Sequence, residues 1–278
     1  MKLTRFGIWT SYTAIGADHA AEAARLVQEL GYGTFWLGGS PEPEALAPLL
    51  GATETLVAAT GITNIWKSDP AAVAAQQAAL EAGHPGRSLI GVGAGHPEAT
   101  SDYTRPRHAT IAFLDALDAA PTPVAADRRV LAALGPRMLD LAAERSLGAH
   151  PYFTGVEHTR FARERLGDGP LLAPELACVV ETDAERGRET ARAYAARYLT
   201  LSNYTSNLLR FGFTEADLAD GGSNRLIDAV IPHGSAAEIA AVVHAHLDAG
   251  ADHVCVQPLG ARDVPRDQWT ALARALEL

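Results

Sequence analysis

Residues 87–96, Arg-Ser-Leu-Ile-Gly-Val-Gly-Ala-Gly-His, combine an apolar run with three glycines and end on a histidine. An apolar run without strict alternation predicts a strand that is covered on both faces. The glycines remove every second side chain, which clears one face of the strand for a ligand or for another backbone. His96 stands at the carboxyl end of this strand, where parallel α/β folds place their chemistry, and an imidazole can exchange a proton near neutral pH. The stretch therefore predicts a strand end that faces a cofactor, with a glycine-rich crossover against a helix as the alternative.

The other strand-like runs end on glycine, small hydroxyls, amides and aromatic side chains. These ends are Trp9 to Tyr12, Gly38 to Ser40, Gly61 to Asn64, Gly135 to Arg137, His150 to Tyr152, Glu175, and Gln257 with Pro258. They lack the paired acids of a glycosidase and the spacing of a Ser-His-Asp triad. Their composition suits a flat, neutral, hydrogen-bonding ring system better than it suits hydrolysis.

Gly135, Pro136 and Arg137 follow an apolar run and open a helical pattern. The free N–H groups and the dipole of a first helical turn favour an anion, and proline fits there because it has no donor to lose. This start predicts a phosphate site, to which Arg137 adds a positive charge. A plain helix cap is the alternative.

Other chemistry has weaker support. His244 and His246 are two residues apart in a helical pattern, so they point to different sides, and we expect no metal site. Cys178 and Cys255 lie in apolar runs and predict buried free thiols.

The net charge of −10 argues against nucleic acid or an anionic membrane as a partner. The sequence has no apolar run of about 20 residues and no leader pattern, so we expect a cytoplasmic protein.

Eight strand-like runs alternate with helical patterns from one end of the chain to the other. The runs lie at residues 6–9, 34–37, 56–62, 89–92, 130–134, 148–153, 171–180 and 253–258. This alternation predicts an α/β fold, a (β/α)8 TIM barrel, with residues 1–278 as a single domain. Residues 202–233 break the rhythm before the eighth strand and predict an insertion that acts as a lid or a substrate-side segment.

Several segments, taken in order, resemble the luciferase-like flavin and deazaflavin oxidoreductases. The segments are residues 6–9, 29–39, 59–66, 89–96, 134–143 and 250–257. The resemblance is to the branch that depends on coenzyme F420 and is common in actinobacteria. It implies a deazaflavin ring across the barrel mouth near Gly39 and Gly95, and a phosphate at the helix start formed by Gly135, Pro136, Arg137 and Met138. It also implies a cis peptide between Gly61 and Ile62 behind the ring, with Thr63 and Asn64 bonding the ring or its side chain.

One departure from the family pattern concerns the proton-transfer residue. Well-known members carry an Asp-His pair after the second strand, where this chain has Gly39-Ser40. We therefore assign the proton-transfer role to His96, with His150 as the second candidate. His150 has the alternative role of a structural residue before a cis Pro151.

The resemblance implies an F420-dependent oxidoreductase that moves a hydride between the deazaflavin and a small organic substrate. The alternatives are an FMN-dependent monooxygenase of the same superfamily, an F420-binding protein without turnover and, last, a metal-dependent hydrolase. Trp9, Tyr12, Trp66 and Tyr152 are the candidate pocket walls, or else packing at the rim. Arg105, Arg107, Arg137 and Arg160 are candidates for the anionic tail, or else solvated surface. The resemblance also allows a homodimer.

Overall fold

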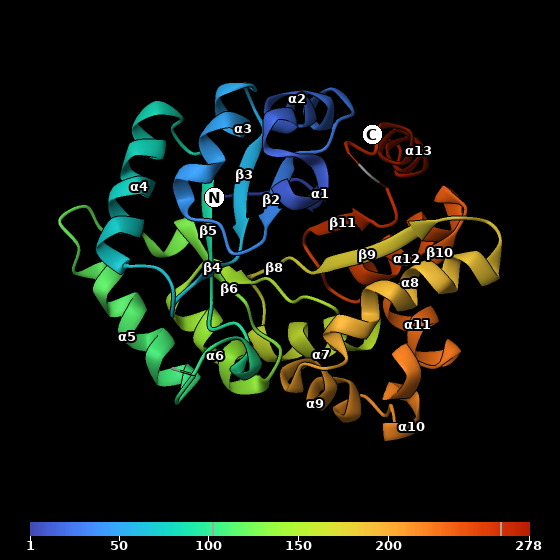
Figure 1. Cartoon of the computed structure of the whole chain (residues 1–278). Helices are drawn as coiled ribbons and strands as arrows, with labels where there is room; N and C mark the ends of the chain where they lie inside the picture. Colours follow the sequence, from blue (N-terminus) through green and yellow to red (C-terminus); the bar gives the residue numbers. More distant parts are fainter. Residues whose placement is uncertain (102, 262) are drawn as a thin grey trace.

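The computed structural model describes residues 1–101, 103–261 and 263–278, in which strands and helices alternate along the chain (Figure 1). The strands are β1 (Phe6–Ser11), β2 (Thr34–Gly38), β3 (Val57–Gly61), β4 (Thr63–Asn64), β5 (Ser88–Gly93), β6 (Arg129–Leu131), β7 (Gly148–Ala149), β8 (Leu171–Leu172), β9 (Glu175–Val180), β10 (His233–Gly234) and β11 (Val254–Pro258). They pair in the order β10-β9-β11-β1-β2-β3-β5-β6-β7-β8, and the short β4 pairs with β5. Each of these pairs is parallel.

The sheet closes on itself because β8 and β9 belong to one extended stretch, residues 171–180. β8 pairs with β7, and β9 pairs with β11 on its other side. Between them, the N–H of Ala173 donates to the carbonyl of Ala149 at 2.9 Å, and the N–H of Glu175 donates to that of Pro151 at 2.9 Å. The predicted α/β fold with parallel strands is confirmed, and each strand-like run contributes to the closed barrel.

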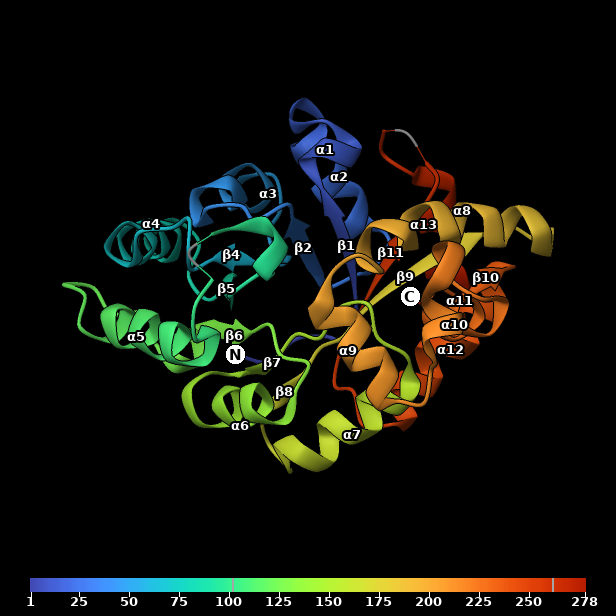
Figure 2. The ribbon, with the colours of Figure 1, turned by 60° about the horizontal axis from the view of Figure 1, so that its bottom comes forward.

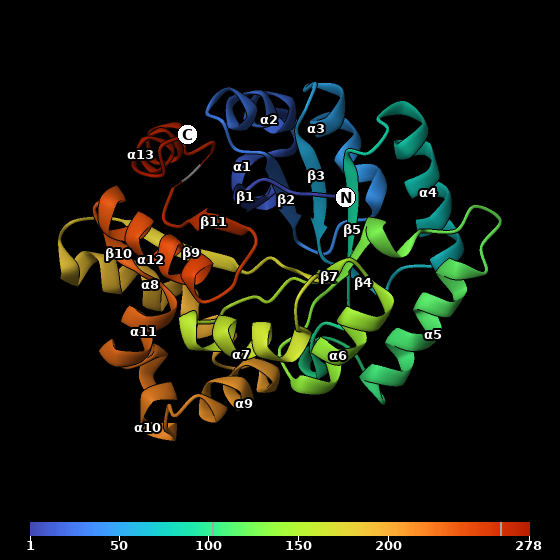
Figure 3. The same ribbon diagram turned by 180° about the vertical axis from the view of Figure 1, so that it is seen from behind.

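Helices form the outer layer of the molecule (Figures 1 and 3). They are α1 (Tyr12–Ile15), α2 (Ala20–Glu29), α3 (Ala47–Gly51), α4 (Pro70–Gly83), α5 (Pro106–Asp118), α6 (Pro136–Arg145), α7 (Val156–Leu166), α8 (Ala184–Tyr198), α9 (Ser202–Arg210), α10 (Glu215–Leu218), α11 (Asn224–Val230), α12 (Ala236–Asp248) and α13 (Arg266–Ala275). Their starts follow local chemistry: Asp69 caps α4 by accepting the N–H of Ala72, and Pro70 fills the first helical position.

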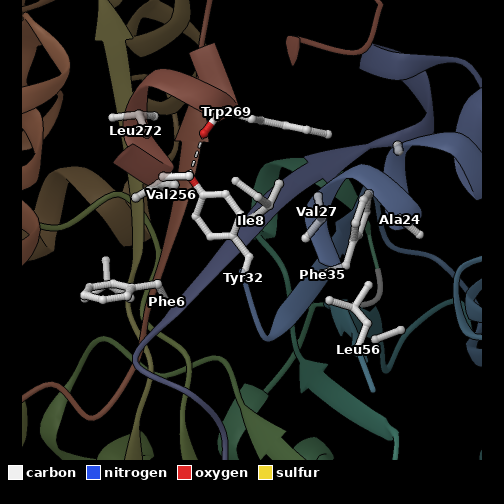
Figure 4. Packing of buried hydrophobic residues seen from close by; sticks show 14 of the residues in the cluster. Phe6, Ile8, Ala24, Val27, Tyr32, Phe35, Leu56, Val256, Trp269 and Leu272 are labelled. Carbon is white, nitrogen blue, oxygen red and sulfur yellow. Dashed lines mark hydrogen bonds between the residues drawn. The ribbon is translucent and has the colours of Figure 1, made fainter. Parts of the chain in front are cut away.

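Two apolar layers hold the barrel and its helices together. Outside the strands, β1 and β2 pack against α2 and α13, and the hydroxyl of Tyr32 donates to the carbonyl of Trp269 at 3.0 Å (Figure 4). Inside, Trp36 stacks on His150 with ring centroids 4.1 Å apart and donates its indole N–H to His253. This interior layer closes one end of the barrel and leaves the carboxyl ends of the strands as the place for a site. Cys178 and Cys255 are buried free thiols, as predicted.

Residues 202–233 form α9, α10, α11 and the start of β10, which pairs with β9. Figure 2 shows α9 crossing in front of the strands, near the middle of the ring of helices. The function of this segment as a lid remains a prediction. Among the described residues, no helix has the length and hydropathy needed to cross a membrane.

Candidate cofactor site

A cavity of about 1420 Å³ lies at the carboxyl ends of the strands. Its wall is built from the residues that follow β1, β2, β3, β5, β6, β7 and β11, together with one side of α9. This is the end of a parallel barrel at which active sites occur, because loops from all the strands converge there. The volume exceeds the 300–1,000 Å³ typical of a small-molecule pocket, so it has room for a cofactor and a substrate.

Most of the predicted site residues line this cavity. They are Trp9, Gly39, Gly61, Ile62, Asn64, Gly95, His96, Gly135, Arg137, Met138, His150 and Tyr152. The structure therefore brings together the ends of seven separate strand regions around one space.

Three predicted side chains lie outside the cavity wall because they serve the local fold. Tyr12 is the first residue of α1 and donates its hydroxyl to the carbonyl of Ala45 at 2.6 Å. Trp66 donates its indole N–H to the carbonyl of Ala94 at 2.6 Å, behind the loop that carries His96. Thr63 is buried and donates to the carbonyl of Pro41 at 3.0 Å. The expectation that Tyr12 and Trp66 wall the pocket, and that Thr63 reaches the cofactor, is not met. Pro136 also lies outside the wall, although both its neighbours line it.

The glycines of β5 make room for the chain itself. The peptide between Gly61 and Ile62 is cis, as the resemblance implies. A Cβ on Gly91 would lie 2.1 Å from the carbonyl oxygen of Thr60, and one on Gly93 would lie 2.9 Å from the side chain of Ile62. Of the two sequence interpretations, clearance for another backbone describes Gly91, whereas Gly93 makes room for the side chains of Ile62 and Ala132. Because Gly91 and Gly93 have no side chains, Ile62 can lie between β5 and the cavity.

His96 is partly buried in the cavity wall, between β5 and α9. Its ring centroid lies 4.9 Å from that of Tyr204, and its Nδ1 lies 3.4 Å from Nδ2 of Asn203. Burial lowers the pKa of His96, Glu98 opposes that shift and Arg197 adds to it. Among the described residues, its Nε2 has no hydrogen-bond partner, so this nitrogen can meet a ligand.

His150 differs from His96 because it belongs to the interior layer. It is 2% exposed, its Nδ1 donates to the carbonyl of Ala173 at 2.7 Å, and it stacks on Trp36. Burial lowers its pKa to about 4, so the ring stays neutral near pH 7. This geometry favours the structural role. The expected cis bond before Pro151 is absent: in the described part of the chain, the cis bond is that of Gly61 and Ile62.

Positive charge predominates in the lining of the cavity. The cationic lining residues are Lys67, Arg105, Arg107, Arg137, Arg197 and Arg210, and the acidic one among the described residues is Asp140. Asp140 is bonded to Arg165 at 2.5 Å, outside the cavity. In the part of the chain that the structure describes, none of the six cations has a carboxylate within 4.0 Å. Arginines elsewhere, such as Arg163 and Arg188, are paired with acids.

The first residues of α6 belong to the lining of the same cavity. Gly135 is its N-cap and offers no side chain to the free amides, and the guanidinium of Arg210 lies 3.8 Å from where a Cβ on Gly135 would stand. Helix dipole, free amides and arginines together make a site for an anion. Arg160, a sequence candidate for the tail, lies outside the wall and pairs with Glu157 at 2.6 Å.

Sequence reasoning missed part of the wall. Arg197 at the end of α8, and Asn203 and Arg210 on α9, line the cavity. The predicted lid segment, residues 202–233, gave the one available signal for Asn203 and Arg210. The segment around Arg197 looks like solvated helix in the sequence, and only the fold brings it to the site. Tyr194 and Tyr198 on α8 were missed for the same reason.

The two histidines of the H-x-H pair have separate environments. His246 is buried and its Nδ1 lies 2.8 Å from the hydroxyl of Thr159, whereas His244 lies edge-on to Phe6. The described residues contain no group of three or more His, Cys, Asp or Glu side chains that could hold a metal ion.

Residues 1–112 match the family model described as luciferase-like monooxygenase. The match covers the N-terminal 112 of the 278 residues, so this part of the chain is similar to that family. No curated protein sequence matches it. The luciferase-like fold extends over the whole chain, since 99% of it aligns with a solved F420-dependent secondary alcohol dehydrogenase in complex with an F420-acetone adduct, covering 99% of that chain with a TM-score of 0.75 at 18% identity.

Two further solved structures have the same fold. The name of one includes coenzyme F420, and the name of the other includes FMN. The coenzyme F420-dependent tetrahydromethanopterin reductase from Methanopyrus kandleri aligns over 99% of both chains, with a TM-score of 0.75 at 14% identity. The oxygenating constituent of 3,6-diketocamphane monooxygenase from Pseudomonas putida, in complex with FMN, aligns over 98% of this chain and 96% of its own, with a TM-score of 0.67 at 17% identity. At these identities the comparison establishes the luciferase-like fold.

Proposed function

We propose that this luciferase-like protein is a flavin- or deazaflavin-dependent oxidoreductase and that its cofactor is coenzyme F420. The observation that carries the proposal is a set of six cations that line the same cavity as the open start of α6 and, among the described residues, have no carboxylate partner, in a chain of net charge −10. Five of them are arginines, and gathering their charges in one cavity without acids is unfavourable unless an anion joins them. A redox cofactor with an anionic tail is such a partner.

The residues present fit a planar ring with a charged tail. Ile62, Trp9 and Tyr152 line the cavity, and the ring centroids of Trp9 and Tyr152 lie 5.1 Å apart. Trp9 also packs against Gly61, where a Cβ would lie 2.6 Å from its Nε1. Gly135 and Arg137 would hold a phosphate through helix amides and a guanidinium.

The number of cations supports F420 over FMN. FMN carries one phosphate, which the α6 start with Arg137 and Arg210 would satisfy. Lys67, Arg105, Arg107 and Arg197 remain as partners for further anionic groups, and F420 is a polyanion. FMN remains the second candidate because a neighbour of the same fold is a complex with FMN.

The cofactor, when bound, supplies hydride transfer, and the chain supplies position and proton control. Ile62 would support one face of the ring. His96 would exchange the proton that accompanies hydride transfer, through the free Nε2. The cover formed by α9, with Asn203 donating to the carbonyl of Gly95 at 2.9 Å, would limit water at the reacting atoms.

Titration of the purified apoprotein with oxidised F420 and with FMN, followed by cofactor absorbance and fluorescence, tests the proposal. We expect F420 to bind at least about tenfold more tightly than FMN and its affinity to fall as salt rises, since salt screens the cations. Arg105→Gln should weaken F420 binding about five- to tenfold, while Arg160→Gln, outside the cavity, should leave it unchanged. Tight FMN binding without F420 binding would overturn the choice of F420 in favour of an FMN-dependent monooxygenase.

A further inference from the structure

Three tyrosine hydroxyls and one carboxamide meet in the cavity wall, although they come from separate parts of the fold. Tyr152 follows β7, Tyr194 and Tyr198 lie one turn apart on α8, and Gln257 lies on β11. We call these four residues the tyrosine–glutamine ring. None of its members has a part in the cofactor site described above, apart from the packing of Tyr152 on Trp9.

The hydrogen bonds of the ring form a closed circuit. Tyr152 donates to Oε1 of Gln257 at 2.9 Å, and Nε2 of Gln257 donates to the hydroxyl of Tyr194 at 3.0 Å. Tyr194 donates to Tyr198 at 3.1 Å, and the hydroxyl of Tyr198 lies 3.2 Å from that of Tyr152. The hydroxyls of Tyr152 and Tyr194 are also in direct contact. Each phenolic oxygen can thus donate once and accept once within the ring.

This circuit leaves hydrogen-bonding capacity for a ligand. Each phenolic oxygen keeps a second lone pair, and the carboxamide keeps a second N–H and a second lone pair. A hydroxyl that rotates out of the circuit becomes a donor to an incoming oxygen. Tyr198 is the member best suited to this, because its rotation leaves the bonds of Gln257 to Tyr152 and Tyr194 intact.

The surroundings of the ring suit a neutral group. Aromatic side chains enclose it: Phe153 stacks on Tyr198 with centroids 5.1 Å apart, and Tyr204 meets Tyr198 edge-on at 5.4 Å. Burial, with the nearby Glu175, raises the pKa of Tyr152 well above its usual value, so this hydroxyl keeps its proton. Within the described chain, no arginine or lysine donates a hydrogen bond to the ring. Burial among aromatic side chains disfavours a charged group, whereas phenolic and carboxamide groups satisfy a neutral oxygen.

We propose that the tyrosine–glutamine ring is the subsite for the hydroxyl or carbonyl oxygen of a neutral organic substrate. The apolar part of that substrate rests on the aromatic wall formed by Trp9 and Tyr204. The cavity then offers two kinds of partner, cations for the cofactor tail and the ring for an uncharged molecule. The word substrate rests on the proposed function, whereas binding of a neutral oxygen at the ring does not.

Three small probes of nearly the same shape test the proposal: cyclohexanone, methylenecyclohexane and cyclohexanecarboxylate. Ligand-observed NMR titrations give the Kd of each, with the protein as purified and again after addition of whichever cofactor it binds. We expect cyclohexanone to bind about tenfold more tightly than methylenecyclohexane, since one hydrogen bond distinguishes them, and cyclohexanecarboxylate to bind more weakly than the ketone. Tyr198→Phe, and as a second variant Tyr194→Phe, should bring ketone and alkene to within about twofold.

Tyr103→Phe is the matched control, because Tyr103 lines the same cavity and its hydroxyl meets Asn203 at 3.3 Å, outside the ring. This variant should keep the preference for the ketone. Equal binding of ketone and alkene by the unaltered protein, or a loss of preference in Tyr103→Phe as large as in Tyr198→Phe, would overturn the subsite. Ketone binding that depends on Tyr198 in a protein that binds neither F420 nor FMN would instead remove the proposed function and keep the subsite.

Discussion

His96 has a neighbourhood that fits proton exchange, because it is partly buried and one nitrogen is free toward the cavity. Replacing it with alanine should lower turnover by about 10²–10⁴-fold, which is the usual contribution of a positioned acid or base. Cofactor affinity should stay within about twofold of that of the unaltered protein, since a neutral His96 adds no positive charge to the cavity lining. Steady-state kinetics with F420, together with the cofactor titration, measures both quantities.

The lowered pKa of His96 gives this prediction a pH signature. In the direction that oxidises the substrate, His96 must be neutral to accept a proton, so kcat/KM falls only as pH drops below 6.5 through the lowered pKa. That limb should disappear in His96→Ala. His108→Ala is the control, because His108 also lines the cavity but lies on α5. Turnover that survives in His96→Ala would remove His96 from the mechanism, and binding without turnover in the unaltered protein would favour a binding protein.

Residue types at strand ends were predictable from the sequence, but side-chain directions were not. Tyr12 and Trp66 share the aromatic character of Trp9 and Tyr152, and their sequence positions relative to strands are similar. Whether each side chain points into the cavity depends on which carbonyl lies in reach, Ala45 for Tyr12 and Ala94 for Trp66. Those partners come from other loops, which the sequence does not place.

At the scale of elements, the α6 start is the part of the site that the sequence predicts best. Its glycine N-cap leaves the first amides without a side-chain partner and has extended φ and ψ of −90° and 160°, which other residues also adopt. Gly135→Asp would place a carboxylate at this cap. An aspartate cap stabilises a helix, but here it would occupy the anion site and pair with Arg210.

We therefore expect Gly135→Asp to keep or raise the melting temperature and to weaken cofactor binding by at least about tenfold. Gly135→Ser is the matched control, since serine caps the helix equally well without a charge. Differential scanning fluorimetry and the cofactor titration measure the two effects. If Gly135→Asp binds cofactor as tightly as Gly135→Ser, the phosphate is not held at α6.

Helices α8 and α9 show the limit of element prediction. The sequence predicts α8 from its periodicity and from the Asp183 cap, which accepts the N–H groups of Glu185 and Arg186. Where α9 lies, it predicts only a break in the strand–helix alternation. The place of both helices over the barrel mouth follows from tertiary contacts, such as the N–H of Ser202 donating to Glu98 at 2.9 Å. The residues these helices bring to the site, among them Arg197, Arg210 and the tyrosines, were therefore beyond sequence reasoning.

For the whole molecule, the alternation of strand and helix was enough to predict the barrel, because parallel strands with short crossovers leave few other arrangements. The positions at which strands are interrupted were harder to predict from the sequence. β8 and β9 are separated at Ala173 and Pro174, so the predicted strand at 171–180 is two short pieces. β3 and β4 are separated at Ile62, and β4 lies beyond the predicted strand at 56–62. Both interruptions lie where the chain shapes the cavity or closes the ring.

The buried titratable groups predict how the stability of the molecule changes with pH. Burial lowers the pKa of His150, His158, His246 and His253 to about 4, below the 6.5 expected when unfolded. Between pH 6.5 and 4 the unfolded chain binds more protons, so these histidines make stability fall as pH falls. Burial raises the pKa of Glu175 to about 8, so this carboxyl has the opposite effect, and stability falls as pH rises from about 4.5 to 8.

Four histidines outweigh one carboxyl below about pH 7, and the carboxyl outweighs them above it, so the free energy of unfolding should be greatest near pH 7. Urea unfolding followed by tryptophan fluorescence, at pH 5, 7 and 8, measures this profile. Glu175→Gln keeps an acceptor for the N–H of Phe153 and removes the ionisation, so it should abolish the fall between pH 7 and 8, where one carboxyl is worth up to about 1.4 kcal/mol per pH unit. Glu29→Gln, at an exposed position on α2, should leave that fall unchanged. An unfolding free energy that rises steadily from pH 7 to 8 in the unaltered protein would show that Glu175 is ionised in the native state and has a cationic partner.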